Sequence, residues 1–281
     1  MYNHSIAPDD IKRYADWLRD EEKSAATIAK YTSYARVFVD FLDLRVLSKD
    51  LVIAFKHGLS EKFTASGANG VIAAVNSLLG FMRRPELKVK FFKIRRGIFI
   101  APETELSRGD LDRLLAAAQS PGKAGLSLVI RTIYSTGIRV SELRFITVQA
   151  VRSGRAEVTL KGKTRVIFLP AKLCEMLKKY IRSQGVLTGP VFVTKNGKPR
   201  DRSGIWRGMK GICQKAGVDP RKVFPHNLRR LFARSFHHVF NDLTELADIL
   251  GHSSVDTTRI YTSNSGAQCR KRLDKLQTML K

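Results

Sequence analysis

Three short segments in the second half of the chain concentrate side chains that could act on a phosphate group. They carry Arg139 and Glu142 in TGIRVSEL, His226 and Arg229 in PHNLRRLFA, and His252 and Tyr261 in LGHSSVDTTRIYT. The planar guanidinium of arginine holds two phosphate oxygens at once and stays charged at any working pH. Arginines from two separate segments could therefore grip both nonbridging oxygens of one phosphodiester.

Tyr261 is the candidate nucleophile of this set. A free phenol has a pKa of about 10 and attacks poorly at neutral pH, so it needs nearby cations and a proton acceptor. Arg229, His226 and His252 could supply both. Of the seven tyrosines in the chain, the main rivals lie in apolar helical settings without such neighbours in sequence, where tyrosine ordinarily packs; they are Tyr31, Tyr34, Tyr134 and Tyr180.

The overall charge points to a polyanionic partner. The formal net charge is +25 at pH 7. Neutralising phosphates releases condensed counterions, so nucleic acid is the leading partner. A merely basic protein, or one lying on an anionic membrane surface, is the alternative on charge alone.

Export, membrane insertion and metal binding all lack a sequence signal. The first residues, MYNHSIAPDD, do not form the basic and then apolar pattern of a signal peptide, and no apolar run reaches the length of a bilayer span. We therefore expect a cytoplasmic protein, associated with the nucleoid when it is bound to DNA. Cys174, Cys213 and Cys269 are far apart and odd in number, which predicts neither a disulfide nor a structural zinc site.

The elements that must position the reactive residues fall into two groups. Of 281 residues, 43% are apolar, enough for one large domain or two modest ones. Residues 8–82 predict a helical bundle, because Pro8 suits a first helical position and Ser24 and Ser48 suit helix N-caps. Apolar residues at helical spacing follow Ser24, namely Ile28, Tyr31, Ala35, Phe38 and Leu42.

Helical periodicity is lost between Arg83 and Glu105. There RRPELKVKFFKIRRGIFIAPE mixes proline, glycine and many basic residues. We interpret residues 85–105 as a basic interdomain linker between domains at 1–84 and 106–281. Such a linker could lie along a phosphate backbone, with Arg95 and Arg96 as contacts, or act as a solvated tether.

The second domain predicts helices around one β-hairpin. A capping box at Ser107 opens it, one helix ends at Gly137, and a later helix begins at Asp242. RAEVTLKGKTRVIFLP contains two β-rich runs joined by a turn at Gly162, which predicts the hairpin. The expected fold class is therefore mainly α with a small β-hairpin, an amino-terminal helical bundle being followed by an α+β domain.

TGIRVSEL, the KGK hairpin, HNLRRLFA and LGHSSVDTTRIYT occur in the order and at the usual separations of the tyrosine recombinase (phage integrase-type) family. The chain resembles this family from about Ser107 to Tyr261. Residues 8–82 more loosely resemble its helical, SAM-like core-binding domain. Because the chain begins directly with this bundle, we expect the two-domain form without an arm-binding domain. Ser263 stands where many relatives have a histidine, a departure that concerns subgroup and not chemistry.

The resemblance implies a role for each reactive residue. Arg139 and Arg229 would clamp the scissile phosphate, and His252 would donate a further hydrogen bond to it. His226 would assist proton movement at Tyr261, the nucleophile.

Two further residues complete the implied site. Lys161, before Gly162, matches the general acid that protonates the leaving 5′ oxygen. Lys163 is its local rival, since a one-residue shift in the hairpin would exchange their directions. Glu142 matches an acidic position that supports Arg139 without reacting.

The implied activity is site-specific recombination. Tyr261 would form a 3′-phosphotyrosyl link and free a 5′ hydroxyl, and a 5′ hydroxyl from a partner duplex would reverse the step, with no cofactor, ATP or metal. Expected partners are double-stranded DNA sites, other copies of the chain in a tetramer on two sites, and accessory DNA-bending proteins. Integration and excision of a mobile element is the expected role, with inversion and dimer resolution left open. The alternatives are a type IB topoisomerase and a sequence-specific DNA-binding protein that has lost catalysis.

Two groups of residues would make further contacts. Candidates for DNA contact in the first domain are Thr27, Lys30, Tyr31, Thr64, Ser66 and Asn69. The segment after Tyr261, with Leu273, Leu276 and Leu280 at helical spacing, would dock on a neighbouring copy or pack on its own domain.

Overall fold

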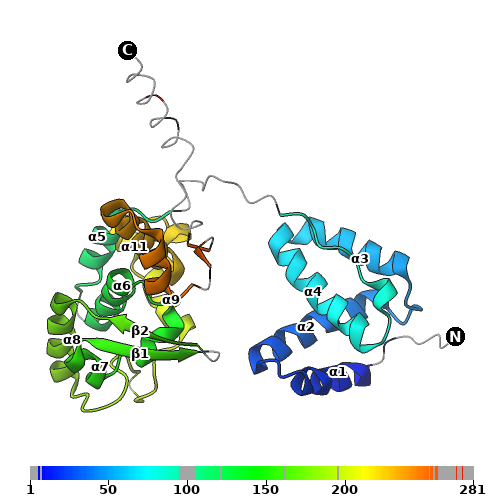
Figure 1. Cartoon of the computed structure of the whole chain (residues 1–281), viewed down its shortest axis with the longest axis horizontal. Helices are drawn as coiled ribbons and strands as arrows, with labels where there is room; N and C mark the ends of the chain where they lie inside the picture. Colours follow the sequence, from blue (N-terminus) through cyan, green and yellow to red (C-terminus); the bar gives the residue numbers. More distant parts are fainter. Residues whose placement is uncertain are drawn as a thin grey trace. The chain divides into compact units, whose positions relative to one another are not determined.

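The structure is a computed structural model that describes residues 6, 8–94, 105–120, 122–160, 163–194, 196–252, 254, 255, 257, 258, 270 and 274. The chain divides into two units, Met1–Arg96 and Gly97–Lys281. In Figure 1 the first unit runs from blue to cyan and the second from green to orange. Each unit has its own hydrophobic core.

The first unit is a helical bundle. Its elements are α1 (Pro8–Asp20), α2 (Ala25–Leu42), α3 (Lys49–Lys62), α4 (Ala65–Phe81) and the 3-10 helix η1 (Pro85–Leu87). Ser24 and Ser48 cap α2 and α3, each accepting a hydrogen bond from the N–H three residues later, so both predicted helix starts are confirmed. The apolar stripe of α2 enters the core, where Phe38 is fully buried and meets the ring of Phe55 edge-on.

Residues 85–94, which the sequence assigns to the linker, pack on this first unit. Leu87 and Val89 are buried in its core. The amide of Asn76 donates to the carbonyl of Val89 and accepts from its N–H, at 2.9 and 3.0 Å. Asn69 holds Phe92 in the same way, at 2.9 and 2.8 Å. Two side-chain amides thus satisfy an extended backbone that has no strand partner, and this stretch is not a solvated tether.

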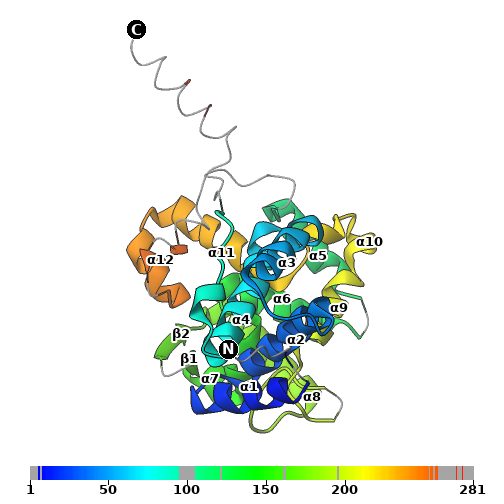
Figure 2. The same ribbon diagram turned by 90° about the vertical axis from the view of Figure 1, so that its right-hand side faces the viewer.

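In the second unit the other elements pack around α6, whose residues are mostly buried. Its elements are α5 (Arg108–Ala117), α6 (Ala124–Thr136), η3 (Val140–Phe145), α7 (Val148–Ser153), β1 (Arg155–Leu160), β2 (Lys163–Phe168), α8 (Ala171–Gln184), α9 (Arg202–Lys210), α10 (Cys213–Ala216), η4 (Pro220–Lys222), α11 (Pro225–Phe240) and α12 (Leu243–Leu250). The capping box at Ser107, the end of α6 at Gly137 and the cap of α12 at Asp242 agree with the sequence-based expectations. In Figure 2 α12 lies beside α11, with which it packs.

The predicted hairpin is confirmed. β1 and β2 pair antiparallel, in a register that runs from Arg155 opposite Phe168 to Leu160 opposite Lys163. One face is buried, since Ala156, Val158 and Ile167 are almost inaccessible to solvent. The mainly helical architecture with one small hairpin is the fold class that the sequence predicts.

Thiols and membrane spans add little to this picture. Cys174 and Cys213 are buried free thiols, and burial raises the pKa of both; Cys269 lies outside the described residues. Every helix in the described part of the chain is too short or too polar to cross a lipid bilayer.

Candidate active site

The TGIRVSEL segment turns sharply from α6 into η3. α6 ends at Gly137, whose φ of 64° favours glycine. A Cβ there would come within 2.5 Å of the Phe232 ring and 2.9 Å of Leu250. Arg139 then caps η3: its backbone N–H donates to Glu142 Oε2 at 2.7 Å, and its guanidinium donates to Oε1 at 3.0 Å. The glycine break therefore fixes the direction in which Arg139 leaves the helix.

Glu142 is a buried carboxylate shared by two arginines. It is 1% exposed, and Arg165 of β2 also donates to its Oε2, at 2.6 Å. Burial alone would raise the pKa of Glu142, but the N–H of Arg139 and the guanidinium of Arg165 outweigh burial and lower the pKa. Glu142 therefore stays ionised, whereas the side chain of Arg139 remains 43% exposed.

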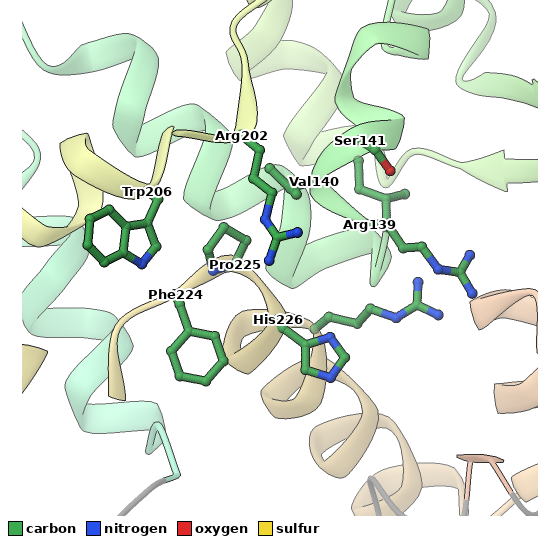
Figure 3. Close-up of a pocket in the computed structure, with 10 residues that line it drawn as sticks. Arg139, Val140, Ser141, Arg202, Trp206, Phe224, Pro225 and His226 are labelled. Atoms are coloured by element: carbon green, nitrogen blue, oxygen red, sulfur yellow. The ribbon is translucent and has the colours of Figure 1, made fainter. Parts of the chain in front are cut away.

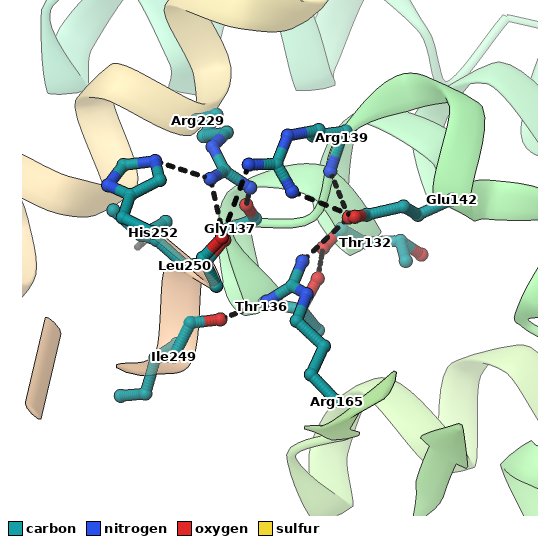
Figure 4. A network of polar contacts seen from close by, with 11 residues as sticks. Thr132, Thr136, Gly137, Arg139, Glu142, Arg165, Arg229, Ile249, Leu250 and His252 are labelled. Atoms are coloured by element: carbon teal, nitrogen blue, oxygen red, sulfur yellow. Dashed lines mark hydrogen bonds and ion pairs between the residues drawn. The ribbon is translucent and has the colours of Figure 1, made fainter. Parts of the chain in front are cut away.

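Arg229 on α11 is a buried cation, 1% exposed. It donates to the carbonyl of Gly137 at 2.6 Å and to that of Leu250 at 2.8 Å, and its Nη2 lies 2.9 Å from His252 Nε2. The two carbonyls belong to the C-terminal ends of α6 and α12, where the helix dipole is negative. Two helix ends thus stabilise this guanidinium, as Figure 4 shows.

The protonation of His252 follows from its neighbours. Arginine has no acceptor, so Nε2 of His252 accepts from Arg229, and the ring proton on Nδ1 is donated to Thr258 Oγ1 at 2.8 Å. Loss of hydration and then nearby arginines, Arg229 first, lower the pKa of His252 to about 4. His252 is therefore neutral at pH 7. Donation from Nε2 to a phosphate would require a second proton or a change of tautomer.

We expect His252 to resist protonation in the free protein. The unfolded chain would bind a proton near pH 6.5 and the folded chain only near pH 4, so His252 lowers folding stability progressively as the pH falls between these values. NMR titration of labelled histidines, with the His252 signal assigned from its loss in His252→Asn, would measure this directly. A midpoint at or above 6.5 would contradict the geometry described here.

His226 lies in the first turn of α11, on the wall of a pocket of about 390 Å³. Figure 3 shows it facing Arg202 of α9, and Arg139 and Arg229 line the same pocket. The imidazole is partly exposed, yet reduced hydration and then surrounding arginines, Arg230 first, lower its pKa. A neutral imidazole in a cationic pocket is suited to accept a proton from a phenol.

The structure brings one group of predicted site residues together, whereas several other predicted residues lie outside the part of the chain that it describes. Arg139, Glu142, Arg229 and His252 form one contact network, and His226 shares the pocket. Tyr261 and Lys161 lie outside the described residues, as do Arg95, Arg96, Leu273, Leu276 and Leu280. The structure describes the backbone of Lys163, the first residue of β2, but not its side chain. The choice of Lys161 over Lys163 as the general acid therefore stays a prediction.

The candidates for DNA contact in the first unit differ in how accessible they are. Ser66 is exposed, and Lys30 is exposed with its ammonium 5.5 Å from the centre of the Tyr34 ring. Thr27 bonds Ser24, Tyr31 is half-buried, and Thr64 caps α4. The amide of Asn69 already holds Phe92, so a base contact from Asn69 would break two hydrogen bonds.

Sequence reasoning missed several residues that the structure adds to the site. Arg165 pairs with Glu142, and Thr258 is fully buried against His252. Arg202 and Trp206 line the pocket. Arg165 had a detectable signal: it is two residues before the buried Ile167, so strand alternation places a charge on the inner face. Arg202 and Trp206 carry no such signal.

Comparison with known proteins gives consistent matches. A model of the "Phage integrase family" matches residues 105–267, more than half of the chain. The tyrosine recombinase XerC of Roseiflexus castenholzii is 29% identical, over 90% of this chain and 88% of its own. A lambda integrase dimer bound to a COC′ core site has a TM-score of 0.74 at 17% identity, covering 92% of this chain and 96% of that one. A lambda integrase tetramer bound to a Holliday junction has a TM-score of 0.74 at 18% identity, covering 92% and 77%.

Proposed function

Because the chain belongs to the phage integrase family, we propose that it is a tyrosine recombinase that cuts and rejoins DNA at specific sites. The observation that carries the proposal is the convergence of Arg139, Arg229 and a neutral His226 on one pocket, with His252 in contact with Arg229. Such a pocket concentrates positive charge where a phosphodiester develops negative charge during attack. The net charge of +25 supports a DNA partner.

The phosphate would be held by both arginines. The exposed Arg139 binds one nonbridging oxygen, and Arg229 binds the other from the pocket wall. Arg229 is already fixed by the two helix ends, so little rearrangement is needed when charge develops. His252 donates from Nε2 to the phosphate once that nitrogen carries a proton, either a second proton that the phosphate charge stabilises or the single ring proton moved from Nδ1.

Tyr261 would be the nucleophile. It follows the buried Thr258, a partner of His252, by three residues, and the chain spans at most about 11 Å over that distance. The phenolic oxygen bonds to phosphorus, its proton passes to His226, and the bond to the 5′ oxygen breaks. Lys161 protonates that oxygen, and the 3′-phosphotyrosyl link keeps the phosphoester for rejoining, so the step itself consumes no ATP.

The finer biological setting belongs to the same proposal. A tetramer of this chain would act on two DNA sites, as the lambda integrase tetramer is bound to a Holliday junction. Accessory DNA-bending proteins would assist. The reaction would take place in the cytoplasm, and its expected use is integration and excision of a mobile element.

A covalent adduct is the direct test of this function. Footprinting on DNA that flanks the gene would first locate a binding site, and a nicked version of that site would then trap cleaved DNA. Incubation without ATP or added metal should give a protein–DNA adduct on a denaturing gel. DNA binding without an adduct would favour a catalytically silent DNA-binding protein. Supercoil relaxation without sequence preference or strand exchange would favour a type IB topoisomerase.

Lys161→Ala should slow cleavage of ordinary DNA by about 100-fold or more, the usual contribution of general acid catalysis. A 5′-phosphorothiolate at the scissile position should restore most of the rate, because its sulfur leaves without a proton. The comparison variant is Lys163→Ala, which should cleave both substrates at nearly the wild-type rate. Rescue of Lys163→Ala but not of Lys161→Ala would transfer the role of acid to Lys163.

A further inference from the structure

Arg165 reaches three parts of the site from one strand of the hairpin. Its Nη2 donates to Glu142 Oε2 at 2.6 Å, and its Nη1 donates to the carbonyl of Ile249 near the end of α12. Its aliphatic part covers Gly251, where a Cβ would lie 2.5 Å from Arg165 Cδ. Figure 4 shows these contacts together, with His252 at the end of the same α12 segment.

Stability alone explains an arginine poorly at this position. Arg165 lies opposite Val158 and two residues before Ile167, both buried, and its own side chain is only 15% exposed. Its Nε is buried without a hydrogen-bond partner in the described part of the chain. Replacing a buried ion pair by apolar side chains is often neutral or stabilising. Apolar side chains at positions 142 and 165 together would avoid this cost.

The charge balance suggests what Arg165 does. Glu142 is one buried carboxylate between two guanidinium groups, so Arg139, Glu142 and Arg165 together keep one uncompensated positive charge. Without Arg165, the charge of Glu142 would be directed at Arg139 alone. The phosphate would then compete with Glu142 for Arg139.

We infer that Arg165 is a positioning residue for DNA cleavage: it shares Glu142 so that Arg139 remains available to the phosphate, and it fixes the end of α12 that carries His252. This inference rests on the recombinase function proposed above. It also assigns a role to β2, which supports the phosphate clamp and begins two residues after Lys161 in the sequence.

Single-turnover cleavage of the nicked site tests the inference. Arg165→Met, which keeps length but removes the charge, should cleave about 100-fold more slowly, the cost of misplacing a catalytic group by about 1 Å. DNA affinity should change less than about threefold, because binding is spread over many surface cations. The matched control is Arg155→Met, an exposed arginine of the same hairpin, which should stay within about twofold of wild type.

A double variant separates positioning from a purely structural role. Adding Glu142→Gln to Arg165→Met removes the competing carboxylate, and cleavage should recover about tenfold relative to Arg165→Met alone. A purely structural role predicts no recovery of cleavage, whatever the melting temperatures of the two variants. That result, or wild-type cleavage by Arg165→Met, would overturn the inference. Failure of the wild-type protein to form any adduct would instead count against the proposed function.

Discussion

Tyr261→Phe is expected to abolish the covalent protein–DNA adduct and to lower cleavage by a factor on the order of 10⁴ or more, as loss of a nucleophile does in other covalent enzymes. Phenylalanine keeps the ring and removes only the attacking oxygen. DNA binding should therefore be unchanged, so gel-shift affinity and adduct yield should separate. Mass spectrometry of the nucleotide-linked peptide from the wild-type protein should identify Tyr261 as the linked residue.

Tyr134 provides the matched control for this experiment. Its hydroxyl accepts a hydrogen bond from Arg108 and lies 3.5 Å from Ser235, so Tyr134 is a tyrosine of the same unit that has a cation beside it. Tyr134→Phe should form the adduct at nearly the wild-type rate. An adduct that survives Tyr261→Phe but not Tyr134→Phe would move the nucleophile to Tyr134.

Arg229→Lys is expected to lower cleavage by about 10²–10³-fold, the cost of losing one preorganised donor to a transition-state anion. Lysine keeps the charge, but a single ammonium cannot reproduce the planar fork that spans Gly137, Leu250 and His252. The variant should also melt at a lower temperature, because a buried carbonyl at a helix end loses its partner. Single-turnover cleavage and thermal melting measure the two effects separately.

Two further variants keep this prediction interpretable. Arg139→Lys changes the exposed arginine of the clamp and should slow cleavage without a comparable loss of thermal stability. Arg182→Lys alters an exposed arginine on α8 and should change neither quantity. Normal cleavage by a folded Arg229→Lys protein would remove Arg229 from the phosphate clamp.

The positions of the helices follow from local sequence rules. Ser24, Ser48, Ser107 and Asp242 each accept a backbone hydrogen bond at a helix start, which is short-range chemistry that a sequence reveals. The hairpin was equally predictable, because two β-rich runs lie on either side of Gly162 in the sequence. These rules also place Arg139 two residues, and His252 one residue, after a glycine that ends a helix.

Contacts between distant segments could not be predicted in this way. Residues 85–94 have no helical or strand periodicity, and their attachment to the first unit depends on the amides of Asn69 and Asn76. The sharing of Glu142 between Arg139 and Arg165 likewise requires that η3 and β2 meet in space. The spacing of residues in the sequence identified which side chains could act on a phosphate. The protonation states of these side chains depend on burial and on neighbours from other elements.

The buried setting of Arg229 has a consequence for the newly synthesised protein. Its hydrogen bonds join residues that are 92 and 21 positions apart along the chain. Contacts of such long sequence separation form late, because the intervening loops must first be closed. The phosphate clamp is therefore complete only when α6, α11 and α12 have all assembled. We therefore expect a chain that ends before α12 to be unable to break a DNA strand, because Arg229 would lack the carbonyl of Leu250.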